Sequence, residues 1–345
     1  MKRVTSRDVA EYVGCSVASV SLVVNGQHEG RISEQLHARI LAAIDVLDYR
    51  PNQSARSLAT RTPSNVVLVC PDVRNPFFGD VFHGIVESLS GKYGVDLRVG
   101  PGGADYDSDT VREAQAGNIA GLVLANPSHE VLATFQATCP TVLIDSPDAT
   151  VSLDRVDIDI RDASRQIAEH LTSLGHRWIA YLDVRRSKDT FVQRREGLEG
   201  SLRANGGNIV ATAFADELSV AEGSKVFLSS WQEWDAVGVT AIVCADDMLA
   251  FGVVGAAHSI GVPIPDRLSI ASYNDIPFAQ LLDPPLTSVT FDGQELGRLA
   301  GQKLLAAIQG DRSGNLTMQT HLQARASTAP APPTPPAATR TPGSR

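Results

Sequence analysis

Polar and aromatic side chains gather in four short loops, and each loop follows an apolar run of the sequence. Together these loops supply amide, carboxyl and guanidinium groups that can hydrogen-bond hydroxyls or heteroatoms, and phenyl rings that can cover an apolar face. We therefore expect a binding site for a small polar ligand. Its candidate residues are Asn75, Phe77, Phe78, Arg194, Asp246, Asn274 and Asp275.

Each of these candidates also has a structural explanation, and residue chemistry alone leaves both open. One of the two adjacent phenylalanines could belong to the core. The arginine could form a surface ion pair, and Arg195 could take its place at the ligand. Asp246 could cap the helix expected near Met248. The last two candidates could simply stabilise their own turn.

The elements that would position these loops alternate along the chain from residue 65 onward. The expected strands are Val66–Cys70, Val95–Val99, Leu122–Ala125, Thr141–Ile144, Trp178–Leu182, Ile209–Ala213, Ala241–Ala245 and Leu268–Ser272. The expected helices include Val81–Lys92, Ala163–Leu174, Val192–Asn205, Val220–Ser229, Met248–Ile260 and Gly293–Ile308. This alternation predicts an α/β body of two lobes, each a parallel sheet covered by helices on both faces. Ligands bind outside the carboxyl ends of such strands, which is where the four loops lie.

The first part of the chain, from Val4 to Gly26, predicts two short helices joined by a tight turn. Thr5 can cap the first helix with Asp8 as its capping-box partner, and Gly14 can end it. A third helix over residues 33–47 would complete a small core. This arrangement predicts a helix-turn-helix unit, whose second helix enters the DNA major groove; the alternative is a helical cap on an enzyme. Its candidate DNA-contacting residues are Thr5, Ser16, Val17, Ala18, Ser21, Leu22 and Asn25.

Charge is divided unevenly along the chain, which has 345 residues and a net charge of -9. Residues 1–62 hold eight Lys and Arg against six Asp and Glu, so they carry +2 and the remainder carries -11. A DNA-facing end on an acidic body fits this mild asymmetry.

Several short motifs resemble the DNA-binding headpiece of the LacI/GalR repressor family. They are Val4-Thr5, Asp8-Val9-Ala10, Val20-Ser21, Val24-Asn25-Gly26, Ser33, Tyr49-Arg50-Pro51-Asn52 and Ala55-Arg56-Ser57-Leu58. The similarity continues to about residue 325 through Asn75-Pro76-Phe77-Phe78, Gly175-His176, Asp246-Asp247-Met248 and Tyr273-Asn274-Asp275. The resemblance implies a body like a type I periplasmic sugar-binding protein, with lobes joined by crossovers near residues 160, 290 and 322. It also implies that Arg194, Asp246 and Asn274 hold an effector.

The resemblance further implies a hinge helix that folds on the operator and wedges a leucine into the minor groove. The alternative is an ordinary linker with an incidental leucine. The candidate DNA-contacting residues of this segment are Asn52, Ala55, Arg56 and Leu58. The expected domains are therefore a headpiece (1–49), a hinge and linker (50–63), an effector-binding body (64–325) and a tail (326–345). The tail is rich in proline, alanine and threonine, so we expect it to be disordered.

Three positions depart from the pattern of the family. Leu22 stands where many members place an arginine on the recognition helix, so guanine readout there is lost. Asn274 stands where an aspartate is common, and Leu218 stands where several members offer an aromatic ring to the ligand.

The sequence contains no phosphate loop, nucleophile elbow or acid–base carboxylate pair, and its four cysteines lack metal-ligand spacing. We therefore expect no enzyme activity, no cofactor and no metal. With no signal peptide or membrane span in view, we expect the protein in the cytoplasm, at the nucleoid when it is bound to DNA.

The sequence as a whole predicts a transcriptional regulator, a repressor, that binds a palindromic double-stranded DNA operator as a homodimer. Its two recognition helices would lie in successive major grooves, ~34 Å apart. A small-molecule effector, a sugar or a related metabolite, would control operator binding from the cleft between the lobes. The alternative is a solute-binding protein with a sugar site and no role at DNA.

Overall fold

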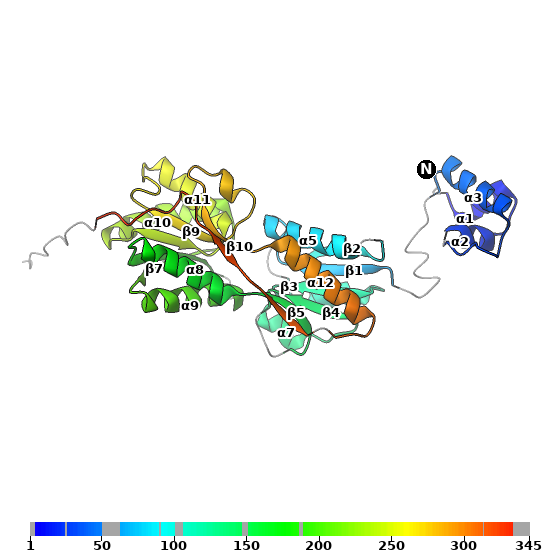
Figure 1. The fold of residues 1–345 in the computed structure, drawn as a ribbon, viewed down its shortest axis with the longest axis horizontal. Helices are drawn as coiled ribbons and strands as arrows, with labels where there is room; N and C mark the ends of the chain where they lie inside the picture. Colours follow the sequence, from blue (N-terminus) through cyan, green and yellow to red (C-terminus); the bar gives the residue numbers. More distant parts are fainter. Residues whose placement is uncertain are drawn as a thin grey trace, which may run out of the picture. The chain divides into compact units, whose positions relative to one another are not determined.

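The computed structural model describes residues 4–24, 26–49, 63–89, 91–100, 106–146, 151–185, 189–312 and 314–333. The chain divides into two compact units, residues 1–64 and 65–345 (Figure 1). The hinge candidates Asn52, Ala55, Arg56 and Leu58, and also Asn25, lie outside the described residues.

The described residues of the first unit form three helices, α1 (Ser6–Val13), α2 (Val17–Val24) and α3 (Glu34–Val46). The expected capping box is present: the Thr5 hydroxyl accepts a hydrogen bond from Asp8 N, and the Asp8 carboxylate accepts one from Thr5 N. Gly14 ends α1 with φ 73°, a left-handed conformation that glycine adopts without strain. The core of the unit is formed by Val9, Ala10, Val13, Val20, Val23, Ile40 and Ala43. The predicted three-helix headpiece fold is therefore confirmed.

The second unit contains two lobes, each built on a six-stranded sheet. The first sheet has the order β11-β5-β4-β3-β1-β2 and the second has the order β12-β10-β9-β8-β6-β7. The strands of the first sheet are β1 Asn65–Cys70, β2 Gly94–Val99, β3 Gly121–Ala125, β4 Thr141–Ile144, β5 Asp154–Ile158 and β11 Asn315–Met318. Those of the second are β6 Trp178–Val184, β7 Asn208–Ala215, β8 Ala241–Cys244, β9 Ser269–Asn274, β10 Thr287–Thr290 and β12 His321–Gln323. All neighbouring strands are parallel except β10 and β12.

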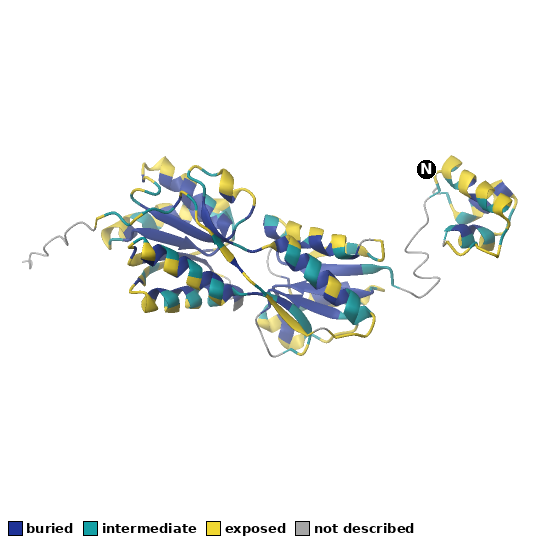
Figure 2. Ribbon diagram, viewed as in Figure 1, coloured by how far each residue is buried: buried dark blue, intermediate teal, exposed yellow. Residues whose placement is uncertain are grey.

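Helices cover both faces of each sheet, and Figure 2 shows the buried strands beneath helices with exposed outer faces. In the first lobe α5 (Pro76–Leu89) and α12 (Gly293–Ile308) pack on one face, and α6 (Ser108–Ala116) and α7 (His129–Thr134) pack on the other. In the second lobe α8 (Ile160–Ser173) packs beside α9 (Asp189–Ala204), and α10 (Val220–Ala236) packs beside α11 (Asp247–Ser259). The predicted α/β class with parallel sheets is therefore confirmed.

Helices α5 and α12 approach each other so closely that only glycine fits at their contact. A Cβ atom added at Gly84 would lie 2.0 Å from the backbone oxygen of Gln294, and one added at Gly297 would lie 2.0 Å from that of Val81. These distances leave no room for a side chain. The contact joins the helix that follows β1 to the helix that follows β10.

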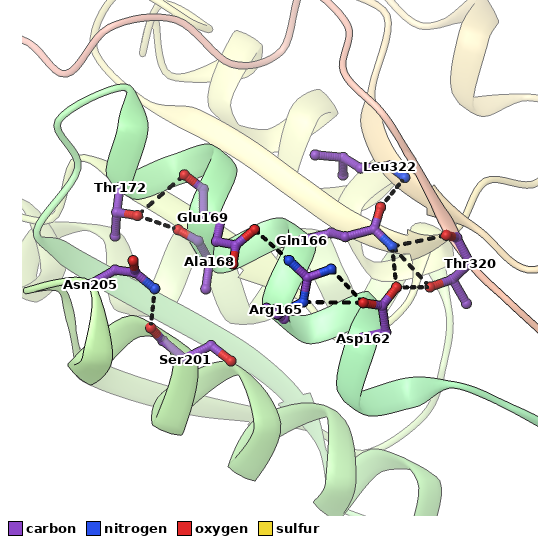
Figure 3. Close-up of polar contacts among 10 residues, drawn as sticks. All are labelled: Asp162, Arg165, Gln166, Ala168, Glu169, Thr172, Ser201, Asn205, Thr320 and Leu322. Carbon is purple, nitrogen blue, oxygen red and sulfur yellow. Dashed lines mark hydrogen bonds and ion pairs between the residues drawn. The ribbon is translucent and has the colours of Figure 1, made fainter.

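The chain passes between the lobes at three places, after β5, after β10 and between β11 and β12. Helix α8 holds the third passage through Gln166 (Figure 3). Its Nε2 donates to the Thr320 carbonyl at 2.9 Å, and its Oε1 accepts from Leu322 N at 2.7 Å. The same amide donates to Asp162, which also pairs with Arg165. These hydrogen bonds anchor the segment between β11 and β12 to α8.

The prediction of a disordered tail from residue 326 onward is wrong for its first residues. Ser327 is fully buried: its hydroxyl donates to the Ile270 carbonyl at 2.6 Å and accepts from Thr287 N at 2.7 Å. Further on, His176 Nε2 donates to the Ala329 carbonyl, at 3.0 Å. Composition predicted disorder because the segment has no core of its own. Instead, its backbone and hydroxyl groups bond to the second lobe, and residues 334–345 lie outside the described part.

Candidate functional site

A cavity lies between the two lobes, at the carboxyl ends of strands from both sheets. It encloses about 580 Å³ of empty space, counting the part that is open to solvent. In each sheet the second strand along the chain lies on one side of the first strand, and the third lies on its other side, so the order of strands changes sides at β1 in one sheet and at β6 in the other. Such points are where open parallel sheets bind ligands. The cavity is lined by Pro71, Asp72, Asn75, Phe77, Phe78, Asn126, Asp145, Phe191, Arg194, Leu218, Asp246 and Asn274.

Six of the seven ligand-binding candidates from the sequence line this cavity. Asp275 does not, although it follows a cavity residue directly. Its carboxylate pairs with Arg325 at 2.6 Å and accepts a hydrogen bond from Thr290 Oγ1 at 2.9 Å. The expectation that it lies with the other candidates is therefore wrong: it ties the end of β9 to β10 and to the segment after β12.

Arg194 is the one cation among the described residues that line the cavity, and only 4% of its surface is exposed. Its guanidinium carbon lies 4.8 Å from the ring centroid of Phe191 and 4.9 Å from that of Phe291. Its Nη1 donates to the Ala245 carbonyl at 2.5 Å, while its Nε has no partner among the described residues. The suggested surface ion pair is thus excluded for Arg194. The neighbouring Arg195 instead pairs with Asp183.

Asp246 is the centre of a buried hydrogen-bond network that joins the lobes. Its Oδ2 accepts from Asn75 Nδ2 at 3.0 Å and from Asn274 Nδ2 at 2.6 Å. Its Oδ1 caps α11 by accepting from Met248 N at 2.8 Å. Burial raises the pKa of the carboxyl. The capping explanation from the sequence is therefore correct, and the same side chain also lines the cavity.

A second polar contact between the lobes was not expected from the sequence. Thr190 on α9 donates from Oγ1 to Asp145, at 3.3 Å. Asp145 and Asn126 each follow a strand directly and have φ 49°, a left-handed conformation that Asp and Asn tolerate. An Asn or Asp directly after an expected strand was the signal that could have found both of them.

Asp247 lies next to this network and is fully buried. Its carboxylate accepts hydrogen bonds from Ser288 Oγ and Ile276 N, both at 2.8 Å. Burial, and after it the neighbouring Asp246, raise its pKa from 3.8 to about 7. Above pH ~4 the unfolded chain therefore releases a proton that the folded protein keeps.

We expect the stability of the body to fall as the pH rises from about 4 to about 7, since over this window the folded state binds more protons than the unfolded state. Asp247→Asn removes this titration, so calorimetric melting temperatures of the variant should depend less steeply on pH. Asp157, whose pKa burial raises to about 6, leaves a residual slope of the same sign. An unchanged slope in the variant would contradict the assignment.

Five of the DNA-contacting candidates of the first unit lie along one side of α2 or at its start. Ser16, Val17, Ala18 and Ser21 are exposed, and Leu22 is half-buried. Thr5 is exposed as well, but its hydroxyl serves the capping box of α1.

A helix-turn-helix unit joined to a two-lobed body with an interlobe cavity defines a ligand-controlled DNA-binding regulator. A family model described as "Bacterial regulatory proteins, lacI family" matches residues 5–52, and a "Periplasmic binding protein-like domain" matches residues 168–328. The chain is 30% identical over 342 residues to the transcriptional regulator MalR of Streptomyces coelicolor, covering 94% of this chain and 96% of that one. The chain belongs to the LacI family of bacterial regulatory proteins.

Two further similarities agree with this membership. The chain is 27% identical over 316 residues to the transcriptional regulator GntR of Escherichia coli, covering 90% and 93% of the two chains. The structure matches the Lac repressor dimer bound to operator and the anti-inducer ONPF with a TM-score of 0.82 and 25% identity, covering 95% of this chain. The sequence-based assignment to a family of transcriptional regulators, and not to an enzyme class, is confirmed. No helix among the described residues is long and apolar enough to cross a membrane.

Proposed function

We propose that this regulator represses transcription from a palindromic operator and that a sugar or sugar-like effector in the interlobe cavity controls its binding to DNA. The observation that carries the proposal is the Asn75–Asp246 hydrogen bond, which joins the lobes through two cavity-lining residues. A ligand that bonds to either side chain competes with this contact and alters the balance between lobe arrangements. It shifts operator binding only by its different affinity for the two arrangements.

The chemistry of the cavity favours a ligand with hydroxyl groups on an apolar ring. Carboxylate and amide oxygens accept hydrogen bonds from hydroxyls, and the guanidinium of Arg194 donates to them. Rings from both lobes, Phe78 from α5 and Phe191 from α9, supply apolar walls. Asn75, Phe77, Asp246 and Asn274 complete the proposed effector contacts.

We propose a homodimer because the body exposes apolar side chains on an edge strand of the first sheet and in the segment between β9 and β10. Strand β2 is an edge strand of the first sheet, with Leu97 and Val99 more than a third exposed. In the second lobe, Phe278 and Leu281 are 55% and 74% exposed. Natural proteins usually cover an unpaired strand edge, and a patch of exposed apolar side chains often marks a surface that another protein covers. A two-fold axis would also present two α2 helices to the half-sites of a palindrome.

The proposal is tested by titrating the purified protein on its own upstream DNA at fixed salt, in the presence of sugars, sugar phosphates or nucleosides. Salt is held constant because phosphate contacts make affinity strongly salt-dependent. We expect sequence-specific binding that one neutral sugar shifts. If the protein binds DNA specifically and no compound alters that binding, the proposed control by an effector in the cavity is wrong. If only nucleosides alter it, the effector is a nucleoside and not a sugar.

The hinge assignment has its own test. Leu58→Ala removes the side chain proposed to wedge into the minor groove. A wedge of this kind keeps the DNA bent, and bent DNA contacts more of the protein surface. We therefore expect at least tenfold weaker operator binding. Effector affinity, measured by calorimetric titration, should not change. If operator binding of the variant equals that of the wild type, residues 50–63 are an ordinary linker.

A further inference from the structure

Helix α2 contains no charged residue and no side-chain amide; its sequence is VASVSLVV. Val20 and Val23 point into the core of the headpiece, where both are buried. The opposite side carries Val17, which is 43% exposed, together with Ala18, Ser21 and Leu22. Neither Val17 nor Leu22 belongs to the headpiece core, so this helix presents apolar side chains outward.

The chemistry of this surface limits what it can read in a major groove. Guanine is recognised by paired hydrogen bonds from Arg or Lys, and adenine by those from Asn or Gln. None of these side chains occurs in α2. Two of the hydroxyls near its start are already engaged, because Ser16 Oγ lies 2.9 Å from Ser19 Oγ and accepts from Ser19 N at 3.1 Å. The groove feature that apolar side chains recognise is the C5 methyl group of thymine.

We propose that α2 reads thymine methyl groups through Val17, Ala18 and Leu22, so that the operator half-site carries A·T pairs where this helix lies. The proposal rests on the DNA-binding function above and adds the class of base that is read. The side chains at 18 and 22 are four residues apart, as are those at 17 and 21, so all four share one face of the helix. A continuous face of this kind can cover methyl groups on adjacent base pairs.

Methyl recognition and phosphate contacts make separate contributions to binding. Phosphate contacts release counterions, so they set the slope of affinity against salt concentration and carry no sequence information. A contact between two apolar groups releases no counterion. Loss of a methyl contact should therefore weaken binding without a change in the salt slope.

The experiment begins with selection of duplexes bound by the full-length protein from a randomised library at fixed salt. Each thymine of the selected half-site is then replaced by deoxyuridine, which keeps base pairing and removes only the methyl group. We expect about a fourfold loss of affinity for each methyl that α2 covers, from the transfer free energy of one buried carbon. Replacement of thymines outside the half-sites is the control.

A double-mutant cycle assigns the contact to a side chain. Leu22→Ala should weaken binding to the thymine operator and should abolish the further loss caused by deoxyuridine at one position. Leu41→Ala is the matched control, because Leu41 is 45% exposed on α3 and should leave the effect of deoxyuridine intact. Leu22→Arg should shift the selected base at that position toward guanine.

Two outcomes overturn the inference in different ways. If the protein selects a specific site in which deoxyuridine has no effect, or in which G·C pairs face α2, the operator function stands and methyl readout is wrong. If selection yields no specific site, the proposed operator function fails, and methyl readout fails with it.

Discussion

The Arg194→Ala variant should bind its operator and no longer respond to the effector. Arg194 is buried in the cavity wall, and its Nε has no hydrogen-bond partner within the part of the chain that the structure describes. Each hydrogen bond from a charged group to a ligand stabilises the complex by about 1.5–3 kcal/mol. The loss of two such bonds corresponds to an effector affinity weaker by on the order of a hundredfold or more. The measurement is a titration of operator binding against effector, with direct effector binding by calorimetry.

Arg203→Ala is the control, since Arg203 lies on the same helix, outside the cavity, and pairs with Glu199. Arg194→Lys separates loss of ligand contact from loss of folding: lysine keeps the charge and an aliphatic stem but lacks the planar fork. If Arg194→Lys folds and still responds at the effector concentration that suffices for the wild type, Arg194 does not hold the effector.

The Gly84→Ala substitution should destabilise the body by about 3 kcal/mol or more. The added Cβ would meet the backbone oxygen of Gln294 at 2.0 Å, and α12 cannot relieve that contact by a rotamer change. Overpacking costs typically 1–3 kcal/mol where side chains can adjust, and here the neighbour is backbone. We expect a melting temperature several degrees lower by calorimetry.

Gly79→Ala, in the same helix α5, should act in the opposite direction. Gly79 is exposed, with no atom within 4 Å of an added Cβ. Alanine is favoured over glycine in a helix by about 1 kcal/mol, so a small rise in melting temperature is expected. Equal effects of the two substitutions would show that the contact between α5 and α12 is not what excludes a side chain at Gly84.

Strong local patterns made much of the fold predictable from the sequence. All eight expected strands are present. Six of them are almost fully buried, and only β2 and β7, which lie at the edges of their sheets, are largely exposed. The strands β5, β10, β11 and β12 were missed, since they are short and carry polar or exposed residues such as Asp157, Ser288 and Asn315. Helix α5 begins at Pro76, five residues before the expected start at Val81.

The candidate site was predictable where a chemical signal coincided with the end of a strand. Six expected residues line the cavity because the loops after parallel strands converge at one end of each sheet. Asp145 and Thr190 were missed because their contact joins elements from different lobes, and a single sequence does not reveal such pairs. Asp275 was misplaced because Arg325, fifty residues later, determines where its carboxylate lies.

The interleaving of the two lobes along the chain has a consequence for synthesis of the protein. The first sheet is completed by β11, and the glycine face of α5 is covered by α12, yet the whole central part of the second lobe is translated in between. At roughly 5–20 residues per second, the surface around Gly84 waits on the order of ten seconds or more for Gln294 to leave the ribosome. During that interval an apolar helix face has no native partner, which exposes the nascent chain to chaperones and to aggregation. A ribosome-bound chain that ends before residue 293 should therefore be captured by chaperones far more than the full-length chain after its release from the ribosome.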